Sequence, residues 1–173
     1  MKINYYGLKA IYLHELDRFR RTLGQSLLSP VISTSLYFIV FGSVIGGYVQ
    51  KIDGISYGSY IVPGLLMLTL LTQSISNTSF GIFFPKFNGT IYEILAAPIS
   101  SFEIVLAFVS AGATKTLIVG IVIFTTSLFF VDVEVQYPFL MCFLLVLVAF
   151  TFALFGFLIG LMSKDFEQMS IVP

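Results

Sequence analysis

The chain alternates between short charged clusters and long stretches without charge. Residues 22–50, 54–85 and 136–163 carry no charged side chain, and residues 104–131 carry one, Lys115. Each stretch exceeds the roughly 20 helical residues that cross about 30 Å of hydrocarbon. The pattern therefore predicts four transmembrane helices, at residues 27–49, 58–81, 104–130 and 138–162.

The residues before the first stretch follow a different pattern. Charged positions separate apolar residues that recur every three or four positions, which is typical of an amphipathic helix. These apolar residues are Tyr5, Leu8, Tyr12, Leu16, Phe19 and Leu23. We expect a helix over residues 5–24 that lies on the membrane surface, with its apolar stripe among the acyl chains. The alternative is a soluble helix packed on the surface of a partner.

The composition indicates a membrane protein. Of the 173 residues, 57% are hydrophobic and 10% are charged, whereas a soluble domain carries about 25% charged residues. We therefore expect an all-α integral membrane protein with one N-terminal interfacial helix and four transmembrane helices. A net charge of zero gives no reason to expect nucleic acid as a partner. The single cysteine, Cys142, can form neither a disulfide framework nor a Cys-rich metal site, and no metal site is expected.

Basic residues outside the predicted spans are distributed unevenly between the two sides of the membrane. One side has Lys51 alone, and the other has Lys2, Lys9, Arg18, Arg20, Arg21, Lys86 and Lys164. Because cytoplasmic loops retain Lys and Arg, both ends of the chain and the loop between the second and third spans are predicted to be cytoplasmic. The N-terminal residues lack the apolar core of a cleavable signal peptide, so we expect the first span to direct insertion.

Small residues recur four positions apart inside three of the spans. This spacing lets the backbones of neighbouring membrane helices approach closely. The positions are Gly42 and Gly46, then Gly112, Thr116 and Gly120, and finally Gly156 and Gly160. We expect helix contacts at these positions, although chance occurrence in a glycine-rich membrane protein is the alternative for each motif.

The loop between the second and third spans carries the clearest local signals. Asn88-Gly89 is a turn dipeptide, and Thr90 with Glu93 has the spacing of a capping box. Pro98 disfavours helical geometry at the residue before it. A two-turn helix is therefore expected over residues 90–97.

This short helix is followed by a second capping box, Ser100 with Glu103, at the start of the third span. Its apolar side chains, Ile91, Ile94 and Leu95, fit the mode of recognition in which a helix occupies a groove on a partner. By pattern alone, an ordinary interfacial loop helix is an equal alternative.

Two groups of polar side chains lie inside the predicted spans. The first is Lys115, which is ionisable, and placing a lysine at the centre of a membrane helix costs about 2.5 to 3.5 kcal/mol. It could meet an anionic substrate, a further span, a lipid phosphate or water at a dimer interface, and a structural role is favoured. Gln73 and Asn77 belong to a polar run in the second span. They could line a pathway or form hydrogen bonds between helices.

Known catalytic patterns fail on their geometry, and no catalytic residue is predicted. Residues 54–58 match G-x-S-x-G, but they lie in a predicted outward loop without a preceding strand. His14, the one histidine, belongs to the opposite side of the membrane. The chain contains no Gly-Lys dipeptide and hence no P-loop. If ATP drives this protein, another chain must bind it.

The chain resembles the permease subunits of bacterial ABC-2 type exporters over essentially its whole length. The resemblance rests on the amphipathic N-terminal helix and on three further segments, residues 60–65 (YIVPGL), 93–100 (EILAAPIS) and 164–173 (KDFEQMSIVP). It implies that residues 90–97 are a coupling helix that docks on a separate ATP-binding subunit, with Thr90, Ile91, Glu93, Ile94, Leu95 and Pro98 as the coupling residues.

The same resemblance implies a bacterial inner membrane location, a permease homodimer, and ATP bound by the partner subunit rather than by this chain. Members of the family that resemble this chain have six spans, and this sequence stops at Pro173, where a fifth should begin. It is expected to be either a fragment of a longer reading frame or a truncated gene product, and the fragment is favoured.

The function expected from the sequence is that of a permease subunit of an ATP-driven ABC-2 type exporter. Two alternatives belong to other classes. One is an ion-coupled carrier or channel that uses Lys115, and the other is a membrane scaffold that transports nothing. A carrier should show carboxylates inside the membrane or repeated broken helices, and neither is visible in the sequence.

Overall fold

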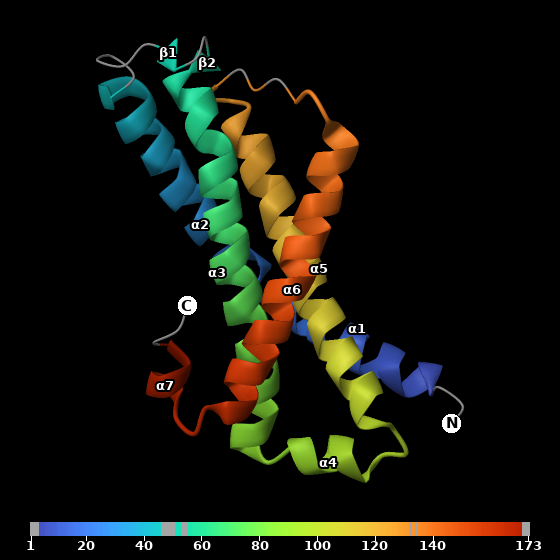
Figure 1. Cartoon of the computed structure of the whole chain (residues 1–173). Coiled ribbons are helices and arrows are strands. Elements are labelled where there is room, and N and C mark those ends of the chain that lie inside the picture. The colour runs from blue at the N-terminus through green and yellow to red at the C-terminus, as the bar shows by residue number, and fades with distance from the viewer. Residues whose placement is uncertain (1–3, 46–50, 53–54, 132, 134, 171–173) are drawn as a thin grey trace.

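The protein is a bundle of long helices with short helices gathered at one end (Figure 1). The computed structural model describes residues 4–45, 51–52, 55–131, 133 and 135–170. The N-terminal elements are α1 (Tyr5–Arg21), α2 (Leu23–Tyr37) and the π-helix η1 (Phe38–Ile45). A two-residue strand pair follows, β1 (Lys51–Ile52) with β2 (Ile55–Ser56). The remaining elements are α3 (Tyr57–Asn88), α4 (Ile91–Ala96), α5 (Ser101–Ser127), α6 (Pro138–Met162) and α7 (Phe166–Ser170).

Four helices are long and apolar enough to cross a membrane, which confirms the all-α membrane fold predicted from the uncharged stretches. They are Leu23–Phe41, Tyr57–Asn88, Ser101–Ser127 and Pro138–Met162. Of these, α5 is largely buried, because α1, α2, α3 and α6 all pack against it. In each of the other three, fewer than a quarter of the residues in the apolar window are buried.

The second long helix extends beyond the predicted boundary at residue 81. It continues through Pro85 and ends at Asn88, where Gly89 adopts a left-handed conformation with φ of 80°. This conformation suits glycine and confirms the predicted turn at Asn88-Gly89. With 32 residues, α3 is about 48 Å long and therefore exceeds the thickness of the hydrocarbon core.

The predicted helix over residues 5–24 is interrupted at Thr22. The Thr22 backbone N–H donates to Phe19 O at 3.0 Å, and its hydroxyl lies 3.3 Å from the carbonyl oxygens of Arg18 and Phe19. Such local bonds compete with the regular helical pattern. The chain then enters the first span at once, as α2 and η1; residues 46–49 of the predicted span lie outside the described residues.

The apolar stripe of α1 packs on the protein itself, which corrects the expectation that it lies among acyl chains. Leu8, Tyr12 and Leu16 are half-buried, and Phe19 is buried among side chains of α3 and α5. The Tyr12 hydroxyl lies 3.1 Å from the Thr114 hydroxyl of α5. The exposed side of α1 is mainly polar and aromatic, with Tyr6, Lys9, His14, Asp17, Arg20 and Arg21. Ala10, Leu13 and Tyr5, the last of which belongs to the predicted stripe, are exposed as well.

Small residues allow α3 to pack tightly between α5 and α6. A Cβ atom added at Gly156 or Gly160 would lie 2.5 Å from the backbone oxygen of Ile75 or Ser79, respectively. On the α5 side, a Cβ atom added at Gly112 would collide with the hydroxyl of Thr78. The predicted helix contacts at these glycines are therefore confirmed, whereas the Gly42 and Gly46 motif falls partly outside the described residues.

The end of α6 is fixed on α3. Lys86 of α3 donates through Nζ to the carbonyl oxygens of Leu161 (2.6 Å) and Ser163 (2.8 Å). These carbonyls lie at the C-terminus of α6, where a cation is favourable. Beyond this point, α7 folds back so that the Phe166 ring lies 4.9 Å and 5.0 Å from the ring centres of Phe83 and Phe87.

Candidate functional site

The short helix α4 connects α3 to α5 at one end of the bundle (Figure 1). Ile91 and Ile94 are half-buried and pack against the hydrophobic core of the protein. Tyr92 and Leu95 point away from the bundle, with exposed fractions of 73% and 60%, and Glu93 is also exposed. Of the three apolar residues expected to fill a groove on a partner, Leu95 alone is directed outward, while Ile91 and Ile94 anchor α4.

The predicted capping box at the start of α4 is not formed. Thr90 has helical backbone angles (φ −66°, ψ −14°) and makes no side-chain cap hydrogen bond, whereas a capping residue needs an extended backbone to direct its oxygen at the next turn. Thr90 follows the left-handed Gly89 directly, and its hydroxyl instead lies 3.4 Å from Pro85 O of the preceding helix. Glu93 therefore does not hold the start of this helix.

The second predicted capping box is confirmed. Glu103 N donates to Ser100 Oγ at 3.3 Å, and Ser100 N donates to Glu103 Oε2 at 2.8 Å. The segment between α4 and α5, which contains Pro98, is thus held at the first turn of α5.

The Glu103 carboxylate also binds the N-terminal segment, a contact that the sequence did not predict. Asn4 N donates to Glu103 Oε1 at 2.6 Å, and Asn4 Nδ2 donates to Pro98 O at 3.1 Å. The Asn4 side chain also caps α1, because its Oδ1 accepts from Gly7 N at 3.1 Å. One carboxylate therefore joins the start of α1 to the start of α5.

An open and mainly apolar cleft separates the first turns of α1 from α4 and the segment that follows it. The predicted coupling residues Glu93, Ile94 and Pro98 lie in its wall. The other lining residues are Asn4, Tyr6, Gly7, Ala10, Ile11, Ala97 and Ile99. The α4 region thus presents both an exposed outer surface and an adjoining cleft.

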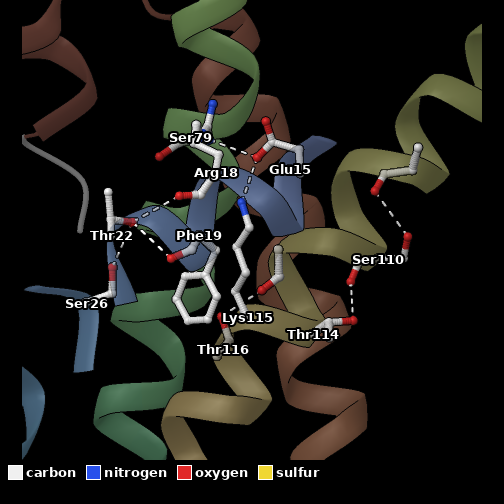
Figure 2. A network of polar contacts seen from close by, with 12 residues as sticks. Glu15, Arg18, Phe19, Thr22, Ser26, Ser79, Ser110, Thr114, Lys115 and Thr116 are labelled. Carbon is white, nitrogen blue, oxygen red and sulfur yellow. Dashed lines mark hydrogen bonds and ion pairs between the residues drawn. The ribbon is translucent and has the colours of Figure 1, made fainter. Parts of the chain in front are cut away.

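Lys115 forms an ion pair with the N-terminal helix (Figure 2). Its Nζ lies 2.6 Å from Oε2 of Glu15, and Nη2 of Arg18 lies 2.8 Å from the same oxygen. Glu15 and Lys115 are 2% and 3% exposed. Gly81 of α3 leaves room for this contact, because a Cβ atom there would lie 3.3 Å from Glu15 Oε2.

None of the four partners considered for Lys115 from the sequence was Glu15. The carboxylate comes from a helix expected to lie on the membrane, 100 residues away. A signal was nevertheless present, because Glu15 lies three residues after Tyr12 and four before Phe19, both in the apolar stripe. A charged residue on the buried side of an amphipathic helix needs a partner there.

Gln73 and Asn77 lie one turn apart on α3 and are both half-buried. Asn77 Nδ2 lies 3.5 Å from Gln73 Oε1, which is a long hydrogen bond. The two side chains bond to each other, and in the described part of the chain neither bonds to Lys115. They form a polar strip on a helix whose other exposed residues are mostly apolar.

Within the described residues, no group of three or more His, Cys, Asp or Glu side chains could hold a metal ion. The ionisable side chains brought together inside the bundle are Glu15, Arg18 and Lys115.

Comparison with known proteins identifies relatives that match the whole length of this chain. The inner membrane transport permease YadH of Escherichia coli (strain K12) is 39% identical over 173 residues, which cover 100% of this chain and 68% of the relative. The permease of the same name from Shigella flexneri matches with the same identity and coverage. No solved structure matches the chain.

The sequence also matches the ABC-2 type transporter family over residues 6–173. This range includes all four apolar helices, α4 and the ion pair between Glu15 and Lys115. The chain is therefore a multi-pass membrane protein that belongs to the ABC-2 type transporter family.

Proposed function

We propose that the chain is the permease subunit of an ATP-driven ABC-2 type exporter and that α4 receives the force from a separate ATP-binding subunit. The observation that carries this proposal is the geometry of α4. It is anchored on the core through Ile91 and Ile94, it exposes Tyr92 and Leu95, and it joins two membrane-spanning helices. A push on its outer surface would therefore act on α3 and α5 together.

The contacts around Glu103 support this route for the force. Because Glu103 binds both Ser100 N and Asn4 N, a displacement of α4 would reach α1 as well as α5. The apolar cleft between α1 and α4 adjoins the exposed side of α4, so the proposed ATPase surface includes residues of both helices.

The distribution of charge supports a cytoplasmic placement of α4 in this proposal. The elements α1, α4 and α7 gather at one end of the bundle, opposite β1 and β2 (Figure 1). The basic residues Lys9, Arg18, Arg20, Arg21, Lys86 and Lys164 belong to the segments at the α4 end. By the positive-inside rule, this end and both chain ends are cytoplasmic in our proposal.

The translocation pathway is proposed to run along the polar strip of α3, with Gln73 and Asn77 facing a second copy of the permease. Half-buried amides inside a membrane helix are costly unless a partner or water satisfies them. The competing carrier or channel interpretation relied on a free Lys115. Its pairing with Glu15 removes the observation that favoured that interpretation.

The outer surface of α4 can be tested by Leu95→Asp in the full-length permease, purified with its ATP-binding subunit. A charge at this exposed apolar position should leave membrane insertion intact, lower the amount of co-purified ATPase and reduce ATP hydrolysis. Leu13→Asp, the same change at an exposed leucine of α1 that does not line the cleft, should have little effect. If Leu95→Asp recovers the ATPase at wild-type stoichiometry with unchanged hydrolysis, α4 is not the coupling element, and the scaffold interpretation gains support.

A further inference from the structure

The charge cluster at Lys115 contains more cations than anions. Arg18 and Lys115 both bind a single oxygen of Glu15, at 2.8 Å and 2.6 Å. Lys115 and Glu15 are almost completely buried, and the Arg18 side chain retains 27% of its exposure. With two cations and one carboxylate, the cluster carries a net charge of +1.

No second carboxylate of the described residues lies within 4.0 Å of either cation. Asp17, the nearest acid along α1, is 60% exposed and lies 3.7 Å from Arg20. Glu103 binds backbone N–H groups of Ser100 and Asn4 instead. Because charge held away from water is costly without compensation, the extra positive charge favours an anion at the partly exposed Arg18, and the described part of the chain supplies none within 4.0 Å.

Arg18, the partly exposed member of the cluster, lies near the expected boundary of the membrane, whereas Lys115 belongs to the membrane-spanning α5. Arg18 precedes the first apolar span, which begins at Leu23, by five residues. Its guanidinium carbon lies 5.9 Å from the centre of the Phe80 ring on α3. The exposed Tyr60, near the opposite end of α3, is taken to lie at the other membrane interface, where tyrosines are enriched. Phe80 follows Tyr60 by 20 residues, which is about 30 Å along a helix and matches the hydrocarbon thickness. Arg18 is therefore level with the polar headgroups.

The exposed side of Arg18 retains the donors that an anion would need. A guanidinium has five N–H donors, and Glu15 accepts from one nitrogen of Arg18. The neighbouring Arg20, Arg21 and Thr22 are exposed. Figure 2 shows the polar groups next to Arg18: the Thr22 hydroxyl lies near the Arg18 carbonyl oxygen, and the Ser26 hydroxyl of α2 lies near that of Thr22.

We propose that the phosphate of an anionic phospholipid binds at Arg18 and neutralises the excess charge of the Glu15, Arg18 and Lys115 cluster. The lipid chains would lie beside the apolar surface of α2, where the side chains of Leu28 and Ile32 are exposed. Arg18 thus has two roles: it satisfies Glu15 inside the protein and contacts the lipid headgroup outside it. The proposal does not depend on ATP or on the direction of transport.

The test measures the ratio of bound phosphatidylglycerol to bound phosphatidylcholine on the purified chain, by native mass spectrometry from mixed micelles. Wild type should prefer phosphatidylglycerol. Arg18→Gln removes the proposed contact, and Lys115→Met removes the excess charge without altering Arg18. Each should lower the ratio about fivefold, since one basic residue near a surface contributes about that factor. Lys9→Gln, a matched loss of charge on the exposed side of α1, should leave the ratio unchanged.

Three results would overturn the proposal. The first is an equal ratio for wild type, Arg18→Gln and Lys115→Met. The second is an equal loss in Lys9→Gln, which would indicate general attraction to the basic helix. The third is displacement of phosphatidylglycerol by inorganic phosphate, which would identify a site for soluble anions. If Arg18→Gln does not fold, the Lys115→Met result decides, because Glu15 and Arg18 remain paired in that variant.

Discussion

At the scale of single residues, Glu15 is the most consequential side chain that the sequence did not assign. It is a carboxylate on the buried side of an amphipathic helix, and it holds Lys115 of α5 and Arg18 of its own helix. Loss of Glu15 leaves two cations without their shared anion, whereas loss of Lys115 leaves Glu15 with Arg18. The two substitutions are therefore unequal, although they break the same ion pair.

This asymmetry can be measured with a double-mutant cycle. Glu15→Gln should lower the free energy of unfolding by about 3 to 5 kcal/mol, because it leaves buried charge uncompensated, and Lys115→Met should cost less. The double variant should be more stable than the sum of the two losses predicts. Unfolding in mixed detergent micelles provides the measurement, with the exposed Asp17→Asn as a control expected to change little. Strict additivity would contradict a direct interaction.

At the scale of elements, the joint between α4 and α5 determines what α4 can move. The two cap hydrogen bonds between Ser100 and Glu103 lie within the joint, and the Glu103 carboxylate also accepts from Asn4 N of the N-terminal segment. Substitutions at these two residues should therefore affect different parts of the structure. Removal of the Ser100 hydroxyl affects the cap, while a change at Glu103 affects the cap and the attachment of α1.

We expect Glu103→Gln to loosen the start of α1 and Ser100→Ala to leave it attached. An amide offers one acceptor oxygen in place of two, so one of the N–H groups of Ser100 and Asn4 loses its acceptor, at about 1 to 3 kcal/mol. Ser100→Ala should cost about 1 kcal/mol. Hydrogen exchange of α1 amides should increase in Glu103→Gln alone. Glu93→Gln is the control, because Glu93 forms no capping box; equal exchange in all three variants would refute the attachment.

Local signals explain which elements could be predicted from the sequence. The four long helices follow from uncharged stretches, and the Asn88-Gly89 turn and the Ser100 cap depend on residues close in the chain. The Thr90 cap failed because Gly89 places Thr90 directly in a helical conformation. The packing of α1 and its contacts from Asn4 and Glu15 involve residues about 100 positions away, and no local pattern specifies such pairs.

At the scale of the whole molecule, the buried α5 connects the membrane-spanning part to the end that carries α1, α4 and α7. The same helix binds Asn4 and Glu15 of α1 through Glu103 and Lys115, and it receives α3 through Gly112. A movement of α4 that shifts α5 must therefore also shift α1 and α3. This coupling can serve transport only if the α4 end faces the compartment that contains ATP.

The orientation of the molecule can be tested at the two ends of α3, because Ser56 and Asn88 are both exposed and about 48 Å apart along one helix. In a Cys142→Ala background, Ser56→Cys should react with an impermeant maleimide from outside intact cells. Asn88→Cys should react only after the membrane is opened, since the proposal places Lys86 and the other basic residues of that end in the cytoplasm by the positive-inside rule. Because α3 is longer than the hydrocarbon core is thick, the two sites belong to opposite sides of the membrane. Labelling of residue 88 from outside intact cells would place α4 away from ATP and would remove the basis for its role in coupling.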